Sequence, residues 1–113
     1  MCDFQKLAFS EHGYIVRCVD CGYLQLAFGT TMLTLNHDDF HALYDMVKFR
    51  LSDTSVNEKN FLSDDTKGIF IPTPSANCCI VLTVKELQHF YRILDKADNE
   101  MKALSLLQLF GNK

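Results

Sequence analysis

The chain has 113 residues, which is the length of one domain with a single core. A hydrophobic fraction of 48% with 22% charged residues is typical of a globular fold and excludes a chain disordered throughout. The formal net charge is −3 and the 11 Lys and Arg residues are scattered. We therefore expect neither a nucleic-acid-binding surface nor a basic stripe that binds membranes.

The N-terminal residues 1–6 contain no charged segment followed by an apolar run, so no secretory signal peptide is predicted. The apolar stretches are too short to span a membrane. Five cysteines, an odd number, favour reduced thiols. We expect a cytoplasmic protein.

The first predicted strand, Tyr14–Cys18, runs into a Cys18-Val19-Asp20-Cys21-Gly22 motif. Two cysteines at this spacing could bind one zinc ion, but a structural zinc site needs four ligands. Cys2 and His12 are the remaining candidates, because adjacent side chains such as those of Cys78 and Cys79 point to opposite faces of a strand.

Two other interpretations of the Cys18 and Cys21 pair stay open. Both could be small buried residues at a tight turn, since free cysteine is among the most buried residue types. A thioredoxin-like redox pair would need its first cysteine at a helix N-terminus, whereas this pair is predicted between strands.

The sequence predicts two β-hairpin–α-helix units, about 14–51 and about 68–97. They form a weak internal repeat at an offset of 47 residues. Each unit has a hairpin signal, with Gly29-Thr30 as the first turn and a longer segment, 72–77, as the second. The second-unit strands are apolar at nearly every residue and are expected to be covered on both faces. The connection 52–67 reads as a mobile surface loop.

Each hairpin is followed by a helix with the same start signals. Asn36 and Thr83 are good N-cap residues, and Asp39 and Glu86 stand three residues on, as in a capping box. Both helices then carry apolar residues at i, i+3, i+4 and i+7, which predicts matching buried faces. The two stripes are Phe40, Leu43, Tyr44 and Val47, and Leu87, Phe90, Tyr91 and Leu94.

The C-terminal helix, about 98–110, follows the polar residues Asp98-Asn99-Glu100. The apolar stripe of the preceding helix continues through them to Leu104, so one helix and two helices are equally compatible with the pattern. The end of the chain is too apolar to lie alone in water, and Leu104, Leu107 and Phe110 are predicted to form a homodimer interface.

A further candidate site begins the first helix, where His37 and His41 are spaced i, i+4 beside Asp38 and Asp39. Two imidazoles at this spacing can share a metal ion or serve an enzyme. Acids at a helix start and a histidine on a polar face are also ordinary features. No G-x-G-x-x-G, Walker A or G-x-S-x-G motif is present.

The segment 13–22, with its C-x-x-C-G motif, and the following 25–29 resemble a small Bacteroidetes family, a domain of unknown function of this length. The resemblance covers the whole chain and implies a bacterial, cytoplasmic protein. It implies no activity and no ligand set.

We therefore predict one α+β domain over residues 1–113. A duplicated β-hairpin–α-helix unit forms an antiparallel sheet with helices packed on it, and an N-terminal strand and a C-terminal helix are added. The preferred function is a non-enzymatic, homodimeric protein-interaction module. A zinc-binding domain built on Cys18 and Cys21 and an enzyme using His37, Asp38, Asp39 and His41 are the alternatives.

Overall fold

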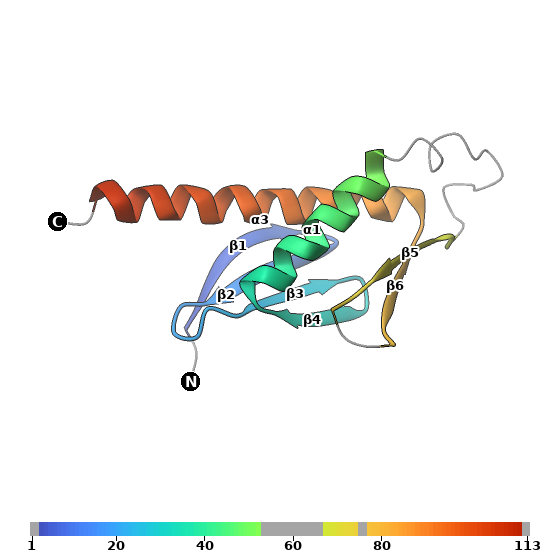
Figure 1. The fold of residues 1–113 in the computed structure, drawn as a ribbon, viewed down its shortest axis with the longest axis horizontal. Helices are drawn as coiled ribbons and strands as arrows, with labels where there is room; N and C mark the ends of the chain where they lie inside the picture. The colour runs from blue at the N-terminus through green and yellow to red at the C-terminus, as the bar shows by residue number, and fades with distance from the viewer. Residues whose placement is uncertain (1–2, 53–66, 75–76, 112–113) are drawn as a thin grey trace.

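The computed structural model describes residues 3–52, 67–74 and 77–111, and confirms the α+β class (Figure 1). Four strands form one antiparallel sheet in the order β1-β2-β3-β4. Their bounds are Phe4–Ser10, Gly13–Cys18, Leu24–Phe28 and Thr31–Leu35. A second, two-stranded sheet pairs β5 (Ile69–Pro72) with β6 (Cys79–Leu82). The helices are α1 (His37–Ser52) and α3 (Val84–Gly111).

The four-stranded sheet is a meander whose strands bury one face. Leu24, Leu26 and Phe28 of β3 are buried, and the intervening Gln25 and Ala27 are partly exposed. Gly13 begins β2 where the backbone of Ala27 approaches so closely that an added Cβ would collide with the Ala27 carbonyl. Gly29 turns the chain into β4 with a positive φ of 59°, which glycine adopts without steric cost.

Both helices start as predicted. The Asp39 amide donates to Asn36 Oδ1 at 2.7 Å. At the start of α3 the bonds are reciprocal: the Glu86 amide donates to Thr83 Oγ1 at 3.0 Å, and the Thr83 amide donates to Glu86 Oε1 at 2.9 Å. This is a complete capping box.

The buried stripes of the two helices are also confirmed. Phe40, Leu43 and Val47 are buried on α1, and Leu87, Phe90 and Leu94 on α3. The predicted stripe residues Tyr44 and Tyr91 are only partly buried. Both helices join one hydrophobic core with the sheet, α3 over β1 and β2 and α1 near β4. The predicted strand–cap–helix order therefore occurs in both halves, while a duplication of the chain stays a prediction.

The structure differs from the predicted architecture in three respects. The two hairpins lie in separate sheets instead of one, and an additional strand, β1, precedes the expected first strand. Of the two alternatives left open for the end of the chain, the structure has one continuous helix over residues 84–111. The β5–β6 sheet is covered on one face only, because the paired Phe70 and Val81 are exposed. Most of the predicted 52–67 loop, residues 53–66, lies outside the described residues.

The far end of α3 extends beyond the sheet toward the C-terminus (Figure 1). A helix of 28 residues is about 42 Å long at 1.5 Å per residue. Burial of its apolar stripe continues to Met101, Leu104 is partly buried, and the leucines after it are exposed. The sheet thus supports only part of the helix. Within the described residues, no helix is long and apolar enough to cross a membrane.

Candidate functional site

A groove of about 460 Å³ lies between the start of α1 and the second half of α3. It combines polar groups with an apolar wall. Its lining residues are Arg17, His37, His41, Asp98, Met101, Lys102, Ser105, Leu106 and Leu109. Both histidines that the sequence singled out on α1 therefore face a concave surface.

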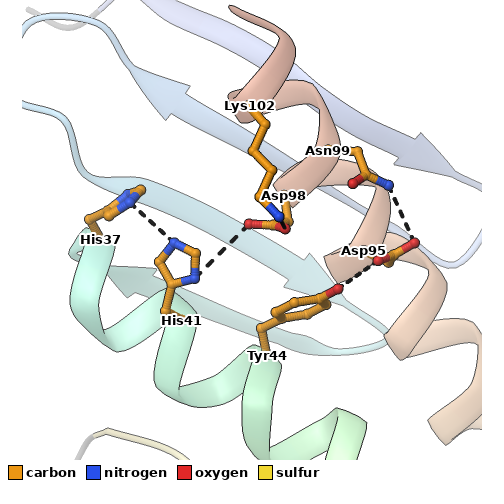
Figure 2. A network of polar contacts seen from close by, with 7 residues as sticks. All are labelled: His37, His41, Tyr44, Asp95, Asp98, Asn99 and Lys102. Carbon is orange, nitrogen blue, oxygen red and sulfur yellow. Dashed lines mark hydrogen bonds and ion pairs between the residues drawn. The ribbon is translucent and has the colours of Figure 1, made fainter. Parts of the chain in front are cut away.

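His37 and His41 lie one turn apart on α1, and their Nε2 atoms are 3.2 Å apart (Figure 2). The rings meet edge to face, with centroids 4.6 Å apart. At this distance the two nitrogens share one proton in a hydrogen bond, so one ring donates and the other accepts. The i, i+4 spacing of the sequence has brought the two imidazoles together as predicted by helix geometry.

The carboxylate that faces the two histidines belongs to Asp98 of α3. Its Oδ1 lies 4.0 Å from His41 Nδ1, and its Oδ2 lies 2.9 Å from Lys102 Nζ. The Asp98 residue is only 3% exposed. Because a buried carboxylate is costly unless it is paired, Lys102 stabilises the charge that faces His41. The same ion pair raises the pKa of Lys102.

Asp38 and Asp39, the two acids next to the histidines in the sequence, lie outside the groove. Asp38 is exposed, and the backbone amide of Asp39 is held by the Asn36 cap. Neither residue lines the groove, whereas Asp98, from the other helix, does. Asp98 was not among the predicted site residues, although one signal was present. The polar residues Asp98-Asn99-Glu100 lie within a helix whose apolar stripe continues before and after them.

A second polar contact joins the helices one turn further on (Figure 2). The Tyr44 hydroxyl donates to Asp95 Oδ1 at 2.6 Å, and Asn99 Nδ2 donates to Asp95 Oδ2 at 3.5 Å. The bond to Asp95, followed by burial, raises the pKa of Tyr44 far above its ordinary value. The Tyr44 ring also stacks on Tyr91 at a centroid distance of 6.0 Å. The two aligned tyrosines thus face each other at the helix interface.

The model of one protein family matches residues 1–110, and its description is "Family of unknown function (DUF6686)". The chain belongs to this family. The match confirms a whole-chain relationship to a domain of unknown function and assigns no activity. No significant match was found among curated proteins or among solved structures.

In this DUF6686 member the predicted zinc ligands do not all come together, and Cys18 forms a disulfide, which corrects the expectation of reduced thiols. Cys18 ends β2 and Cys21 lies in the turn that follows, where its amide donates to Cys18 Sγ at 3.5 Å. His12 precedes the other end of β2, which has 6 residues and is about 17 Å long. One ion cannot contact both ends. Among the described residues, no three His, Cys, Asp or Glu side chains form a metal-binding group, and Cys2 lies outside those residues.

The other two histidines of the DUF6686 chain form a second pair, which the sequence did not indicate. His12 stacks on His89 of α3 with ring centroids 3.9 Å apart. Burial, followed by the charge of His12, lowers the pKa of His89. The two residues line a pocket of about 380 Å³ between the β1–β2 turn and α3.

The apolar end of α3 is exposed in the described part of the DUF6686 chain. The exposed fractions of Leu106, Leu107 and Leu109 are 55%, 65% and 73%. A groove of about 970 Å³ lies on a second side of this helix end. Its lining includes Arg17 and Val19 from the sheet and Leu104, Leu107 and Leu109 from α3. The side chain of Phe110, the third predicted interface residue, lies outside the described residues.

Proposed function

We propose that this chain is a non-enzymatic protein-interaction module that forms a homodimer through the apolar end of α3, residues 103–109. The observation that carries the proposal is the exposure of Leu106, Leu107 and Leu109 on a helix end that extends beyond its own sheet. An uncovered cluster of leucines in water is typical of an interaction site.

The chemistry of this helix end favours a second copy as its partner. Residues 103–112 contain no charged side chain, while the whole chain carries a net charge of −3. Two such segments can therefore meet without placing like charges together. A partner that recognised the chain by charge would find no charged group on this segment.

The surroundings of the helix end also favour self-association. Leu107 and Leu109 line the groove of about 970 Å³, and Leu106 and Leu109 line the groove of about 460 Å³. In a two-fold symmetric dimer the same patch is used by both subunits, so a helix end flanked by grooves can supply the inserted side chains and the surface that receives them.

The expected affinity is modest. Full burial of a leucine contributes about 1.5–3 kcal/mol, and each of these leucines is already partly covered, so about 1–2 kcal/mol each is available. The loss of translational and rotational freedom opposes this gain by at least about 4 kcal/mol. Over both chains the leucines supply about 6–12 kcal/mol, which leaves at most about 8 kcal/mol. We therefore expect a dissociation constant no tighter than about 1 μM, which corresponds to −8.2 kcal/mol.

Light scattering over a range of concentrations, from about 1 μM, the tightest dissociation constant expected, to about 1 mM, tests the proposal. The wild-type mass should rise from one chain to two. Leu107→Glu places a charge in the interface and should keep the chain monomeric throughout. Phe49→Glu is the matched control, because Phe49 on α1 is also 65% exposed but lies away from this helix end. The control should dimerise like the wild type.

Two results would refute the proposal. One is a wild-type mass that stays at one chain over the whole range. The other is a dimer that survives Leu107→Glu and is lost with Phe49→Glu, which would move the interface to α1. Circular dichroism of both variants shows whether each retains the helical fold.

A further inference from the structure

The distance between the two groove histidines matches the geometry of a shared metal ion. Zinc binds imidazole nitrogen at about 2.0–2.1 Å in tetrahedral sites, which places two such nitrogens about 3.3 Å apart. The Nε2 atoms of His37 and His41 are 3.2 Å apart before any metal is bound. We propose that His37 and His41 form a two-histidine site for a divalent transition-metal ion such as Zn²⁺.

The position of Asp98 supports this assignment. Metal-binding histidines usually present their second ring nitrogen to a carboxylate, which fixes the tautomer and the ring orientation. Asp98 Oδ1 lies 4.0 Å from Nδ1 of His41, longer than a hydrogen bond, while Nε2 of the same ring faces His37 (Figure 2). The negative charge of Asp98 favours the tautomer with the proton on Nδ1, which leaves the lone pair of Nε2 on the side of His37. Asp98 is therefore a positioning residue that does not itself contact the ion.

The site is also built into the fold. Both histidines belong to one helix, so their spacing is set by a single turn. The ring of His41 packs edge-on against the buried Phe40, with centroids 5.6 Å apart. Little rearrangement is needed to bind an ion, which reduces the cost of binding.

The protein supplies two ligands, since no third His, Cys, Asp or Glu among the described residues joins them. The other coordination positions face the groove and are open to water or to a small ligand. Zinc, copper and nickel ions bind well to imidazole, whereas magnesium and calcium ions prefer oxygen ligands. The site should therefore discriminate between Zn²⁺ and Mg²⁺.

The chain offers a matched control in its other histidine pair. His12 and His89 are stacked with 22° between the ring planes and centroids 3.9 Å apart. Ring-nitrogen lone pairs lie in the plane of the ring, so stacked rings direct them side by side and not toward a common point. This pair should not chelate a metal ion.

Titration calorimetry of the untagged protein with ZnCl₂ tests the proposal, with MgCl₂ as a comparison. His37→Gln and His41→Gln should each remove one equivalent of zinc binding or weaken it at least tenfold. His12→Gln should leave that equivalent unchanged. Asp98→Asn should weaken it by at most about tenfold, the low end of the effect of losing a hydrogen-bonded carboxylate, because Asp98 lies beyond hydrogen-bond length of His41. The exposed thiols of Cys21, Cys78 and Cys79 are present in every variant, so their contribution cancels.

Identical zinc isotherms for the wild type and both groove-histidine variants would overturn the proposal, as would an equal loss in His12→Gln. Imidazole NMR signals provide a second measurement that does not depend on any substitution. Zinc should shift the ring signals of His37 and His41 and leave those of His12 and His89 in place. The Leu107→Glu variant should bind zinc normally, so failure of the dimer and failure of the metal site are distinguishable.

Discussion

The Tyr44 hydroxyl on α1 donates a hydrogen bond of 2.6 Å to the Asp95 carboxylate on α3. This bond joins the two helices of a DUF6686 chain next to the groove that holds His37 and His41. An acceptor with a full negative charge holds the phenol proton tightly, and this is why the pKa of Tyr44 is raised.

We expect Tyr44→Phe to lower the free energy of unfolding by about 1 kcal/mol, the usual value for a partly exposed hydrogen bond. The effect should also depend on pH. A group whose pKa is raised in the folded state contributes stability below its unfolded pKa, here about 10, and loses that contribution as the pH rises further. Urea denaturation at pH 8 and pH 11 measures both.

The difference in stability between the wild type and Tyr44→Phe should therefore shrink between these two pH values. A difference that is unchanged at pH 11 would show that the bond to Asp95 does not hold the proton. Tyr23 is a suitable control, because its exposed ring lies in the β2–β3 turn and Tyr23→Phe should have little effect at either pH.

Asp98 and Lys102 should be strongly coupled in stability. Removing the lysine leaves a buried carboxylate without its cation, whereas removing both charges leaves none. Lys102→Met should therefore destabilise the wild type but have little effect in an Asp98→Asn background. A double-mutant cycle by chemical denaturation measures this coupling, and additive effects would contradict it.

The capping box at the start of α3 should contribute about 1 kcal/mol, the typical cost of replacing an N-cap threonine by alanine. Thr83→Ala removes the side-chain acceptor of the Glu86 amide. The cost is expected in the free energy of unfolding, measured with urea. Asn36→Ala at α1 is the parallel variant, since Asn36 Oδ1 plays the same part there.

Glu86 adds a pH dependence of opposite sign to that of Tyr44. Lys67, bonded at 2.6 Å, and then the Thr83 amide lower the pKa of Glu86. A lowered pKa contributes stability above the unfolded value of about 4.3, and this contribution is lost as the pH falls through the folded value. The stability advantage of the wild type over Glu86→Gln should fall between pH 6 and pH 3. An advantage that grows toward acid would refute this account.

Phe90 and Phe49 illustrate how far exposure decides the outcome of a substitution. Phe90 is fully buried and packs on Phe28 with ring centroids 4.8 Å apart, whereas Phe49 is 65% exposed. Phe90→Ala should lower the free energy of unfolding by about 3–5 kcal/mol. Phe49→Ala should change it by less than about 0.5 kcal/mol. Thermal or urea denaturation separates the two.

The helices were predictable from sequence because their signals are local. Asn36 and Thr83 mark both starts, and the buried stripes repeat within a few turns. The strand β1 was missed because its register shifts between Lys6 and Ala8, which buries the adjacent Leu7 and Ala8 and breaks the alternation that identifies a strand.

The candidate site was only half predictable. His37 and His41 meet because one helical turn separates them, and the spacing shows this directly. Asp98 is 57 residues away from His41 along the chain and reaches it only because α3 packs against α1. The separation of the two hairpins into different sheets likewise depends on tertiary packing, which a local pattern does not specify.

The proposed dimer is tested most directly by isotope-filtered NOE spectroscopy on a mixture of labelled and unlabelled chains, at a concentration where the dimer is populated. The account predicts contacts between chains at the methyl groups of Leu106, Leu107 and Leu109. If those methyl groups show no contact between chains, or if the contacts lie instead at Phe49 and Phe70, the end of α3 is not the interface.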